Sequence, residues 1–491
     1  MMPPSAGGEE LSALPEAVEW LEVRADLAGD LEPEWLRSRF RGRLLYALRS
    51  RAAGGRFEGS TRDRHERLRR AARYYDLIEL EGEHDFSTDL LAEIPTDRRL
   101  VSWHGPASAL PELRARFTQL CCVPASLYKL VTRAAKGSDE LAPLTLLRSL
   151  GRRDTIAYST GPLGFWSRLV APHLGAPIIF GEVHNGQTDA REPSINKLIE
   201  DYGLPELLPL EAIYGIVGSP VFHSLSPRLH NAAYRATNYP ALFVPFHVES
   251  FSEFWHEVVQ GEALERLGIP IKGLTVASPH KEAALLAAKI VSPVAQRAES
   301  ANILVRCDEA WKADTTDPEV VFMAARARGV RMKQKRAAVV GCGGAGRAIA
   351  ATLKQAGAAV TLVNRDAQRG LMAARLLGLS YVPLRRFNVA DYDIVVNATP
   401  VGRDDGEVPF EVESLGADAL VIDLVYSSGV TPLVASARSH GLLVINGREV
   451  LLTQARRQFQ MMTGAEMPAT MARERTGCES EPSALIVARQ A

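Results

Sequence analysis

The chain has 491 residues, and at the usual ~100–200 residues per domain this length predicts two or three domains. Hydrophobic residues make up 46% and charged residues 23% of the sequence, which excludes wholesale disorder and collagen-like repetition. Fifty-seven basic against 58 acidic residues leave a formal net charge of −1, so we expect no general attraction to nucleic acid or to an anionic membrane.

No apolar run reaches the ~18–20 residues that span a bilayer. The N-terminal residues lack the basic and apolar segments of a secretion or transit signal. The five cysteines show no CxxC spacing and are too few for a disulfide framework. We therefore expect a cytoplasmic protein with no metal site, no membrane segment and no nucleic-acid partner, whose oligomeric state stays open.

The first 205 residues alternate short β-rich runs with longer amphipathic segments. These repeats predict an α/β fold with a parallel sheet and outer helices, and their recurrence favours a closed (β/α)8-type barrel. The seven predicted strands are VEWLEVR (18–24), RLLYALR (43–49), DLIELE (76–81), LVSWHG (100–105), LYKLVTR (127–133), DTIAYST (154–160) and PIIFGEV (177–183). Such a barrel needs eight strands, and the segment before Val18 supplies no clear first strand.

A second α/β series follows a joint with two prolines at 204–211, and its main landmark is the segment 337–365. This segment has the pattern of a strand, a glycine turn, a helix and a second strand. Glycines suit the turn because the backbone must approach a pyrophosphate with no Cβ in the way. The turn consists of Gly341, Cys342, Gly343, Gly344, Ala345 and Gly346. The complete βαβ pattern predicts a Rossmann dinucleotide-binding domain.

The end of the second strand of this unit indicates which dinucleotide binds. An acidic residue there would accept the ribose hydroxyls of NAD, whereas a cation accommodates the extra phosphate of NADP. The chain has Asn364 and Arg365 at this point, and Arg347 and Arg369 would add positive potential. Each arginine alone is more often a solvated surface charge, but together they favour NADP(H).

From residue 212 to about 464 the chain resembles the shikimate dehydrogenase family. The matching motifs are GSPVFHSLSPRLHN (218–231), GLTVASPHK (273–281), ESANILV (299–305), DTTD (314–317), GCGGAGRA (341–348), NRD (364–366), NATPVG (397–402), DLVY…TPL (423–433) and NGREVLLTQARRQF (446–459). The resemblance implies that Lys281 and Asp317 form the catalytic pair. It implies a substrate carboxylate held by Ser224 and Ser226, ring hydroxyls held by Asn302 and Gln454, and an NADP site lined by Asn364, Arg365 and Thr399.

These residue types suit the reduction of a ketone. A lysine ammonium can deliver a proton to the alkoxide that develops as nicotinamide gives up hydride, and a nearby carboxylate orients that lysine. Three positions depart from the family pattern: Ala277 replaces a threonine, Thr315 replaces an asparagine, and Arg403 replaces a methionine. They concern substrate preference and affinity more than the class of reaction.

The first half resembles type I 3-dehydroquinate dehydratase over about 185 residues. The motifs are Glu22-Val23-Arg24 with Asp26, Arg49 ahead of Gly54-Gly55, DLIELE (76–81), Ser102-Trp103-His104, Tyr128-Lys129 and GPLGFWSR (161–168). The resemblance implies that Lys129 forms a Schiff base with the substrate ketone and that His104 is the general base. It implies that Arg168 pairs with the substrate carboxylate and that Glu22, Arg24 and Arg49 hold hydroxyls and orient the site.

Two further departures occur in this half. Ala53 stands where the family commonly has a glutamate, and Ala190-Arg191-Glu192 occupy the expected position of a substrate-closing loop that usually carries a glutamine.

The predicted domains are the barrel (1–205), a dehydrogenase substrate-binding domain (212–318, completed by about 448–470), the Rossmann domain (319–447) and a flexible tail (471–491).

The sequence therefore predicts a bifunctional shikimate-pathway enzyme acting on small molecules. It would dehydrate 3-dehydroquinate to 3-dehydroshikimate and reduce that product with NADPH to shikimate. One alternative is a monofunctional shikimate or quinate dehydrogenase with an inactive barrel. Another is a non-enzymatic NADP-sensing regulator, against which the presence of Lys129, His104, Lys281 and Asp317 speaks.

Overall fold

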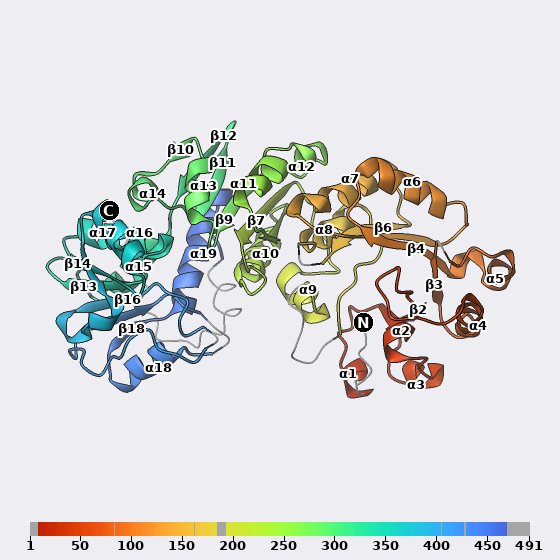
Figure 1. Cartoon of the computed structure of the whole chain (residues 1–491), viewed down its shortest axis with the longest axis horizontal. Helices are drawn as coiled ribbons and strands as arrows, with labels where there is room; N and C mark the ends of the chain where they lie inside the picture. Colours follow the sequence, from red (N-terminus) through yellow and green to blue (C-terminus); the bar gives the residue numbers. More distant parts are fainter. Residues whose placement is uncertain are drawn as a thin grey trace. The chain divides into compact units, whose positions relative to one another are not determined.

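The computed structural model describes residues 8–82, 84–161, 163–183, 193–403, 405–426 and 429–468. The chain divides into two compact units, Met1–Ile271 and Lys272–Ala491 (Figure 1). The joint predicted at 204–211 lies inside the first unit, between a helix that ends at Tyr202 and a strand that begins at Ala212.

The first unit begins with six parallel strands in sequential order. Their bounds are β1 (Trp20–Arg24), β2 (Arg43–Ala47), β3 (Leu77–Glu81), β4 (Arg99–Pro106), β5 (Leu127–Arg133) and β6 (Thr155–Thr160). Helix α1 (Gly8–Ser12) precedes these strands. The helices between them are α2 (Ala25–Ala28), α3 (Pro33–Arg37), α4 (Thr61–Ala71), α5 (Thr88–Glu93), α6 (Leu110–Leu120) and α7 (Leu141–Leu150), with the short 3-10 turns η1 (Thr96–Arg98) and η2 (Gly137–Glu140). After β6 come α8 (Trp166–Val170), the 3-10 turn η3 (Ala171–Leu174) and α9 (Ile195–Tyr202).

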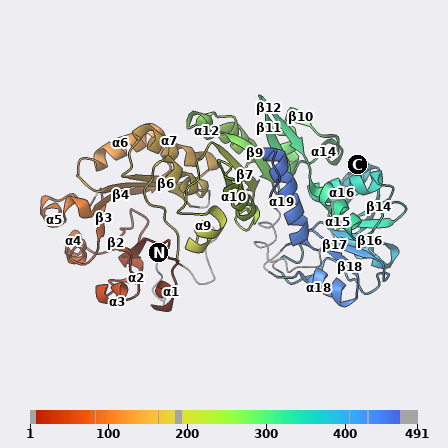
Figure 2. The same ribbon diagram turned by 180° about the vertical axis from the view of Figure 1, so that it is seen from behind.

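Local sequence signals explain these helices. Ser60 and Asp63 form a capping box that starts α4, and Gly151 in the left-handed conformation ends α7. The apolar residues Leu113, Phe117 and Leu120 repeat at helical spacing on α6, and all three are buried. Helices α6 and α7 therefore lie along β4, β5 and β6 and cover this side of the sheet (Figure 2).

The seventh predicted strand differs from the expectation. Residues 177–183 form only an isolated bridge, between Glu182 and Ser194. Pro177 lacks a backbone donor, which removes one possible ladder hydrogen bond from this segment. Over the described part of the first half the parallel sheet is a half-barrel of six strands, which agrees with the expected α/β barrel class, although the seventh predicted strand does not join this sheet.

The rest of the first unit is a second α/β segment. Strands β7 (Ala212–Gly218) and β8 (Ala241–His247) pair in parallel, and the backbone N–H of Ile213 donates to the carbonyl of Pro270 (2.9 Å). The helices of this segment are α10 (Ser226–Thr237), α11 (Phe251–Phe254), the π-turn η4 (Trp255–Val259) and α12 (Ala263–Arg266).

The second unit starts with β9 to β12, whose neighbours follow the order β10-β12-β11-β9. Their bounds are β9 (Ile271–Val276), β10 (Ile290–Val291), β11 (Ile303–Cys307) and β12 (Ala310–Asp314), with helices α13 (Lys281–Ala287), α14 (Pro293–Ala298) and α15 (Asp317–Ala327). The long helix α19 (Gly447–Thr463) packs against α15 and β11.

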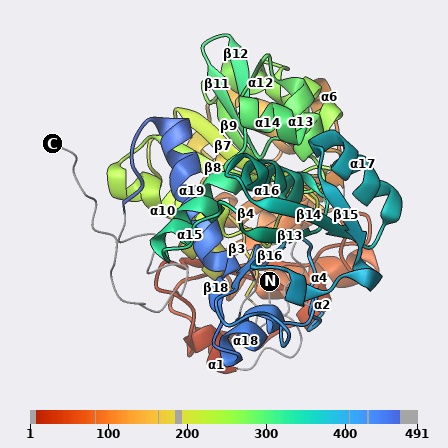
Figure 3. The same ribbon diagram turned by 90° about the vertical axis from the view of Figure 1, so that its left-hand side faces the viewer.

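A six-stranded parallel sheet follows in the order β15-β14-β13-β16-β17-β18. The strands are β13 (Arg336–Val340), β14 (Ala359–Asn364), β15 (Ser380–Pro383), β16 (Ile394–Asn397), β17 (Leu420–Asp423) and β18 (Leu443–Ile445), and the helices are α16 (Gly344–Gln355), α17 (Ala367–Leu377) and α18 (Pro432–Ser439), with turns η5 (Leu384–Arg386) and η6 (Val389–Asp391). This is the doubly wound Rossmann order, and α17 lies beside β14 and β15 (Figure 3).

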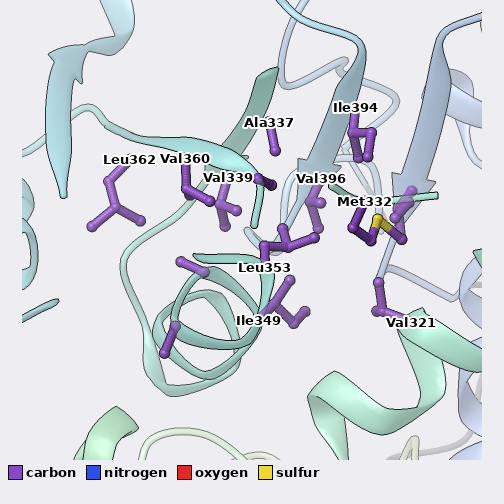
Figure 4. Close-up of a cluster of buried hydrophobic side chains, with 14 of the residues drawn as sticks. Val321, Met332, Ala337, Val339, Ile349, Leu353, Val360, Leu362, Ile394 and Val396 are labelled. Atoms are coloured by element: carbon purple, nitrogen blue, oxygen red, sulfur yellow. The ribbon is translucent and has the colours of Figure 1, made fainter. Parts of the chain in front are cut away.

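The core of this sheet is apolar on both faces, as expected for buried parallel strands. On one face Val339, Val360 and Val396 point toward Ile349 and Leu353 of α16 (Figure 4). A separate buried cluster covers the other face. The packing fixes α16 against the sheet and so holds the glycine turn at the helix start.

Candidate active sites

Charged side chains from strands β1, β3, β4 and β5 meet within the half-barrel. Lys129 of β5 donates from Nζ to Glu22 Oε1 of β1 (3.2 Å) and to Glu79 Oε2 of β3 (3.1 Å). His104 of β4 lies with Nε2 3.0 Å from Glu79 Oε1.

Lys129 is fully buried, with 0% of its side chain exposed, and Glu79 is 1% exposed. The lysine Nζ also lies 4.5 Å from the centre of the Phe180 ring. Two carboxylates and an aromatic face therefore surround this one amine. The contacts hold the amine in one position within the cluster.

The histidine is prepared to accept a proton at neutral pH. Burial and the charge of the Arg49 guanidinium together lower the pKa of His104 to about 4, although the Glu79 carboxylate raises it. A carboxylate only accepts hydrogen bonds, so the contact with Glu79 assigns the ring proton to Nε2. Nδ1 is then the nitrogen of His104 that can take a proton.

Glu79 is the site residue that the motif comparison missed. Burial raises the pKa of Glu79, but the charges of Lys129 and Arg49 lower it more, to well below its usual value. The ionised carboxylate therefore links the lysine and the histidine in one cluster. Its only signal in the sequence is a carboxylate inside the buried strand motif DLIELE.

Arg49 pairs with the carboxylates of this cluster, whereas the ion pair of Arg24 is with Asp26. Arg49 Nη2 lies 2.9 Å from Glu22 Oε1 and 3.7 Å from Glu79 Oε2. Burial raises the pKa of Glu22, but Lys129 and Arg49 lower it more, to about 2. Arg24 instead makes a bidentate pair with Asp26, at 2.8 and 2.7 Å.

Arg168 is connected to the lysine through the segment after β6. Its Nη1 donates to the carbonyl of Phe180 (3.1 Å), whose ring is the one beside Lys129, and its guanidinium lies 4.9 Å from the Tyr158 ring centre. Arg168 is 3% exposed, so a carboxylate that binds it must enter the site. The expected closing loop, Ala190-Arg191-Glu192, lies outside the described residues.

A second cluster forms in the Lys272–Ala491 unit around one aspartate. Lys281 begins α13 and Asp317 begins α15, and Lys281 Nζ lies 2.7 Å from Asp317 Oδ2. Asn302 Nδ2 and Gln454 Nε2 both donate to Asp317 Oδ1, at 2.9 and 2.6 Å. Asp317 is 4% exposed, and these three donors hold its side chain beside the lysine.

Asn302 is itself fixed by the loop that carries Asp317. The backbone N–H of Thr316 donates to Asn302 Oδ1 (2.9 Å), and Asn302 Nδ2 donates to Thr316 Oγ1 (3.0 Å). Gln458, one helical turn after Gln454, donates to the same Thr316 hydroxyl (3.4 Å). The sequence prediction grouped Lys281, Asp317, Asn302 and Gln454, and the structure brings these four side chains together.

The two predicted carboxylate-binding serines lie at the start of α10 in the first unit. Ser226 is the first residue of α10, and its backbone N–H donates to Ser224 Oγ (3.2 Å). The serine loop, residues 219–225, carries Ser224 and leads into this helix. Helix starts offer N–H groups to anions, which suits a carboxylate ligand here.

The glycine turn lies at the switch point of the Rossmann sheet, between β13 and β16. Gly341 has φ +106, and a Cβ there would meet the carbonyl of Ala398 at 2.7 Å. A Cβ on Gly346 would collide with the carbonyl of Gly341. Gly343 caps α16, whose first turn includes Gly344 and Ala345. Gly341 and Gly346 are thus required where the turn packs against backbone, whereas a Cβ on Gly343 would meet only Arg369 Nη2, so Gly343 leaves space at the helix start that suits a pyrophosphate.

Thr399, which follows β16, lines the same switch point. Its hydroxyl donates to Asn397 Oδ1 (2.7 Å) and accepts from the N–H of Val401 (3.2 Å). Asn397 in turn donates to Asp423 Oδ1 (2.9 Å), and Asp423 accepts from the Thr431 hydroxyl (2.6 Å). This buried network, formed by the NATPVG and DLVY…TPL motifs, holds the loop beside the glycine turn.

The cations expected near the dinucleotide separate into two kinds. Arg365 is exposed after β14, next to Asn364, and the Arg369 guanidinium lies 3.9 Å from where a Gly343 Cβ would be. Arg347 does not fit the expectation of free positive potential. It is buried and pairs with Glu282 (2.7 Å) while donating to the carbonyl of Ala298 (3.0 Å). The Arg347 guanidinium therefore stabilises the packing of α16 against α13 and α14.

Comparison with known families agrees with both clusters. The type I 3-dehydroquinase family matches residues 5–206. The shikimate dehydrogenase substrate binding domain matches residues 216–304, and the shikimate/quinate 5-dehydrogenase family matches residues 323–403. A chloroplastic bifunctional 3-dehydroquinate dehydratase/shikimate dehydrogenase of Arabidopsis thaliana is 27% identical over 480 residues, which cover 91% of this chain and 78% of the plant protein.

A shikimate dehydrogenase (NADP(+)) of Acidiphilium cryptum is 38% identical over 245 residues, covering 49% of this chain and 86% of that protein. A solved shikimate 5-dehydrogenase of Thermus thermophilus, in complex with NADP(H) and shikimate, aligns with 30% identity over 54% of this chain and 98% of its own, with a TM-score of 0.48.

Within the described ranges no helix is both long and apolar enough to cross a membrane.

The fold and the two clusters define an enzyme with a lyase half and a dinucleotide-dependent oxidoreductase half. The chain belongs to the shikimate dehydrogenase family, and in the same polypeptide it carries a type I 3-dehydroquinase half.

Proposed function

We propose that the chain catalyses two consecutive steps: it dehydrates 3-dehydroquinate through a Schiff base and reduces the resulting 3-dehydroshikimate to shikimate with NADPH. The observation that carries the proposal is the presence of two complete clusters, Lys129 with Glu79 and His104, and Lys281 with Asp317. Boundaries near residues 205, 318 and 447 and a cytoplasmic location are part of the same proposal.

In the dehydratase step the Lys129 amine adds to the substrate ketone, and loss of water gives an iminium. The iminium acidifies the adjacent C–H, and His104 Nδ1 takes that proton to leave an enamine. The same histidine then returns the proton to the departing hydroxyl, which leaves as water. Hydrolysis of the product iminium releases 3-dehydroshikimate and regenerates Lys129, while Arg168 pairs with the substrate carboxylate throughout.

The protonation of His104 provides a direct test of this role. A base works in its neutral form, which dominates above the pKa, and here that pKa is about 4 instead of 6.5. In an NMR titration of histidine-labelled protein, the resonance that His104→Gln removes should stay at its neutral position from pH 8 down to 5.5. A transition of this resonance between pH 6 and 7 would contradict the burial and charge arrangement of the site.

In the dehydrogenase step, NADPH when bound supplies hydride to the carbonyl carbon. The turn fits this cofactor because Gly341 and Gly346 allow its close packing against backbone and Gly343 leaves open space at the start of α16. Lys281 delivers a proton from Nζ to the developing alkoxide oxygen, and Asp317 orients the ammonium at 2.7 Å. Ser224 and Ser226 bind the substrate carboxylate, and Asn302 and Gln454 hold the ring hydroxyls next to Asp317.

Preference for NADP over NAD should depend on Arg365. A guanidinium–phosphate contact contributes about 1.5–3 kcal/mol, so Arg365→Ala should raise the KM for NADP about 10- to 100-fold and leave the KM for NAD nearly unchanged. Steady-state shikimate oxidation with each cofactor measures this. The matched control is Arg375→Ala, an exposed arginine in the last turn of α17, which should change neither KM. Equal effects of both substitutions would refute the assignment.

Substrate choice is tested on the intact chain. We expect 3-dehydroquinate to give the absorbance of conjugated 3-dehydroshikimate, and shikimate with NADP to be oxidised faster than quinate with NAD. Faster NAD-linked quinate oxidation would favour a quinate dehydrogenase. No turnover of 3-dehydroquinate would leave the half-barrel without the proposed activity.

A further inference from the structure

One helix of the dehydratase-type half touches the serine loop of the dehydrogenase. Helix α9 lies inside the segment matched by the type I 3-dehydroquinase family, yet Lys197 Nζ on this helix donates to the carbonyl of Phe222 (2.6 Å). Phe222 stands two residues before Ser224. The ammonium therefore anchors the backbone of the loop that is proposed to receive the substrate carboxylate.

Further contacts hold the two segments together within the same compact unit. The Phe165 and Phe222 rings lie 5.0 Å apart between their centres, and Phe165 immediately precedes α8, the helix that carries Arg168. Asn231 of α10 donates to the carbonyl of Asp201 on α9 (3.1 Å). Rings and hydrogen bonds thus fix the serine loop from the dehydratase side.

We propose that Lys197 is a positioning residue of the dehydrogenase reaction, which holds the serine loop so that Ser224 and Ser226 are ordered for the substrate carboxylate. This inference rests on the proposed function. Lys197 does not touch the reacting atoms; it acts through the Phe222 carbonyl. The dehydratase half is, on this account, a structural part of the dehydrogenase substrate site.

The contact has the properties of a fixed anchor. A hydrogen bond from an ammonium to a carbonyl is short and stronger than a neutral one, and Lys197 is half-buried between α9 and the loop. The neighbouring ion pair between Arg228 of α10 and Glu200 of α9 has a distance of 3.1 Å, and the Glu200 side chain is 51% exposed. Glu200→Gln is therefore a matched control on the same surface.

The test compares Lys197→Met, Lys197→Arg and Glu200→Gln in shikimate oxidation with NADP. Lys197→Met should raise the KM for shikimate about 10-fold, with kcat and the KM for NADP within about twofold, because lost carboxylate binding acts on substrate affinity. Lys197→Arg retains a charged donor and should restore the KM to within about threefold. Glu200→Gln should behave like wild type, and unchanged turnover of 3-dehydroquinate reports that each variant is folded.

Two measurements separate positioning from general destabilisation. With the methyl ester of shikimate, which has no carboxylate charge, Lys197→Met and wild type should have equal KM values. The effects of Lys197→Met and Ser224→Ala on shikimate KM should also be non-additive, because both act through one loop. An unchanged shikimate KM in Lys197→Met, or an equal loss with the ester, would overturn the inference. Absence of shikimate oxidation in wild type would instead refute the proposed function.

Discussion

Lys129→Ala is expected to abolish dehydration of 3-dehydroquinate, with a fall in kcat of at least about 10⁴-fold, and to leave shikimate oxidation unchanged. The reason is that no other group in the cluster can form the iminium that acidifies the substrate C–H. The substitution also removes one of the two cations that the buried Glu22 and Glu79 share and leaves them only Arg49, which lowers the free energy of unfolding by up to about 3–5 kcal/mol.

Lys129→Arg separates chemistry from stability in this experiment. A guanidinium keeps the positive charge between the two carboxylates but stays protonated and forms no Schiff base. We expect Lys129→Arg to be folded and equally inactive. Borohydride with 3-dehydroquinate should attach a reduced adduct to the Lys129 peptide of wild type only. An adduct on another lysine, or dehydration by Lys129→Arg, would exclude the proposed nucleophile.

Lys281→Ala should lower kcat for shikimate oxidation by about 10²–10⁴-fold, the range typical for loss of a general acid–base group. The substrate carboxylate is bound elsewhere, so the KM for shikimate should change much less than kcat. Asp317→Ala should have an effect of similar size, because Asp317 accepts from Lys281, Asn302 and Gln454 together.

The measurement is steady-state oxidation of shikimate with NADP, and each variant is its own folding control through the dehydratase reaction. That reaction uses the separate cluster around Lys129 and should proceed at the wild-type rate. If Lys281→Ala keeps kcat within about threefold of wild type while it remains folded, Lys281 is not the proton-transfer group.

The sequence predicted the Rossmann domain well because its signals are local. Glycines at fixed offsets, a strand before them and a helix after them define the turn at Gly341, and the structure has β13, α16 and β14 at these places. The half-barrel was predicted less completely. Residues 177–183 have β-rich composition, but a strand also needs a neighbour to pair with, and periodicity carries no information about that neighbour.

The site residues also differ in how well local sequence motifs predict them. Family motifs predicted Lys129, His104, Lys281 and Asp317 as site residues, and their roles stay predictions; Glu79 was not predicted because a glutamate within a strand motif has no distinct local signature. Its role is visible only when β3, β4 and β5 bring Lys129 and His104 to the same carboxylate. Arg347 was misjudged for the opposite reason: its position beside the glycine turn suggests phosphate binding, but the tertiary fold buries it against Glu282.

The most direct test of two activities in one chain is a coupled assay that starts from 3-dehydroquinate and NADPH with no other enzyme. Wild type should consume NADPH and form shikimate. Lys129→Ala should consume none until 3-dehydroshikimate is added, and should then match the wild-type rate. Lack of NADPH consumption by wild type with 3-dehydroquinate, or undiminished consumption by Lys129→Ala, would contradict the account.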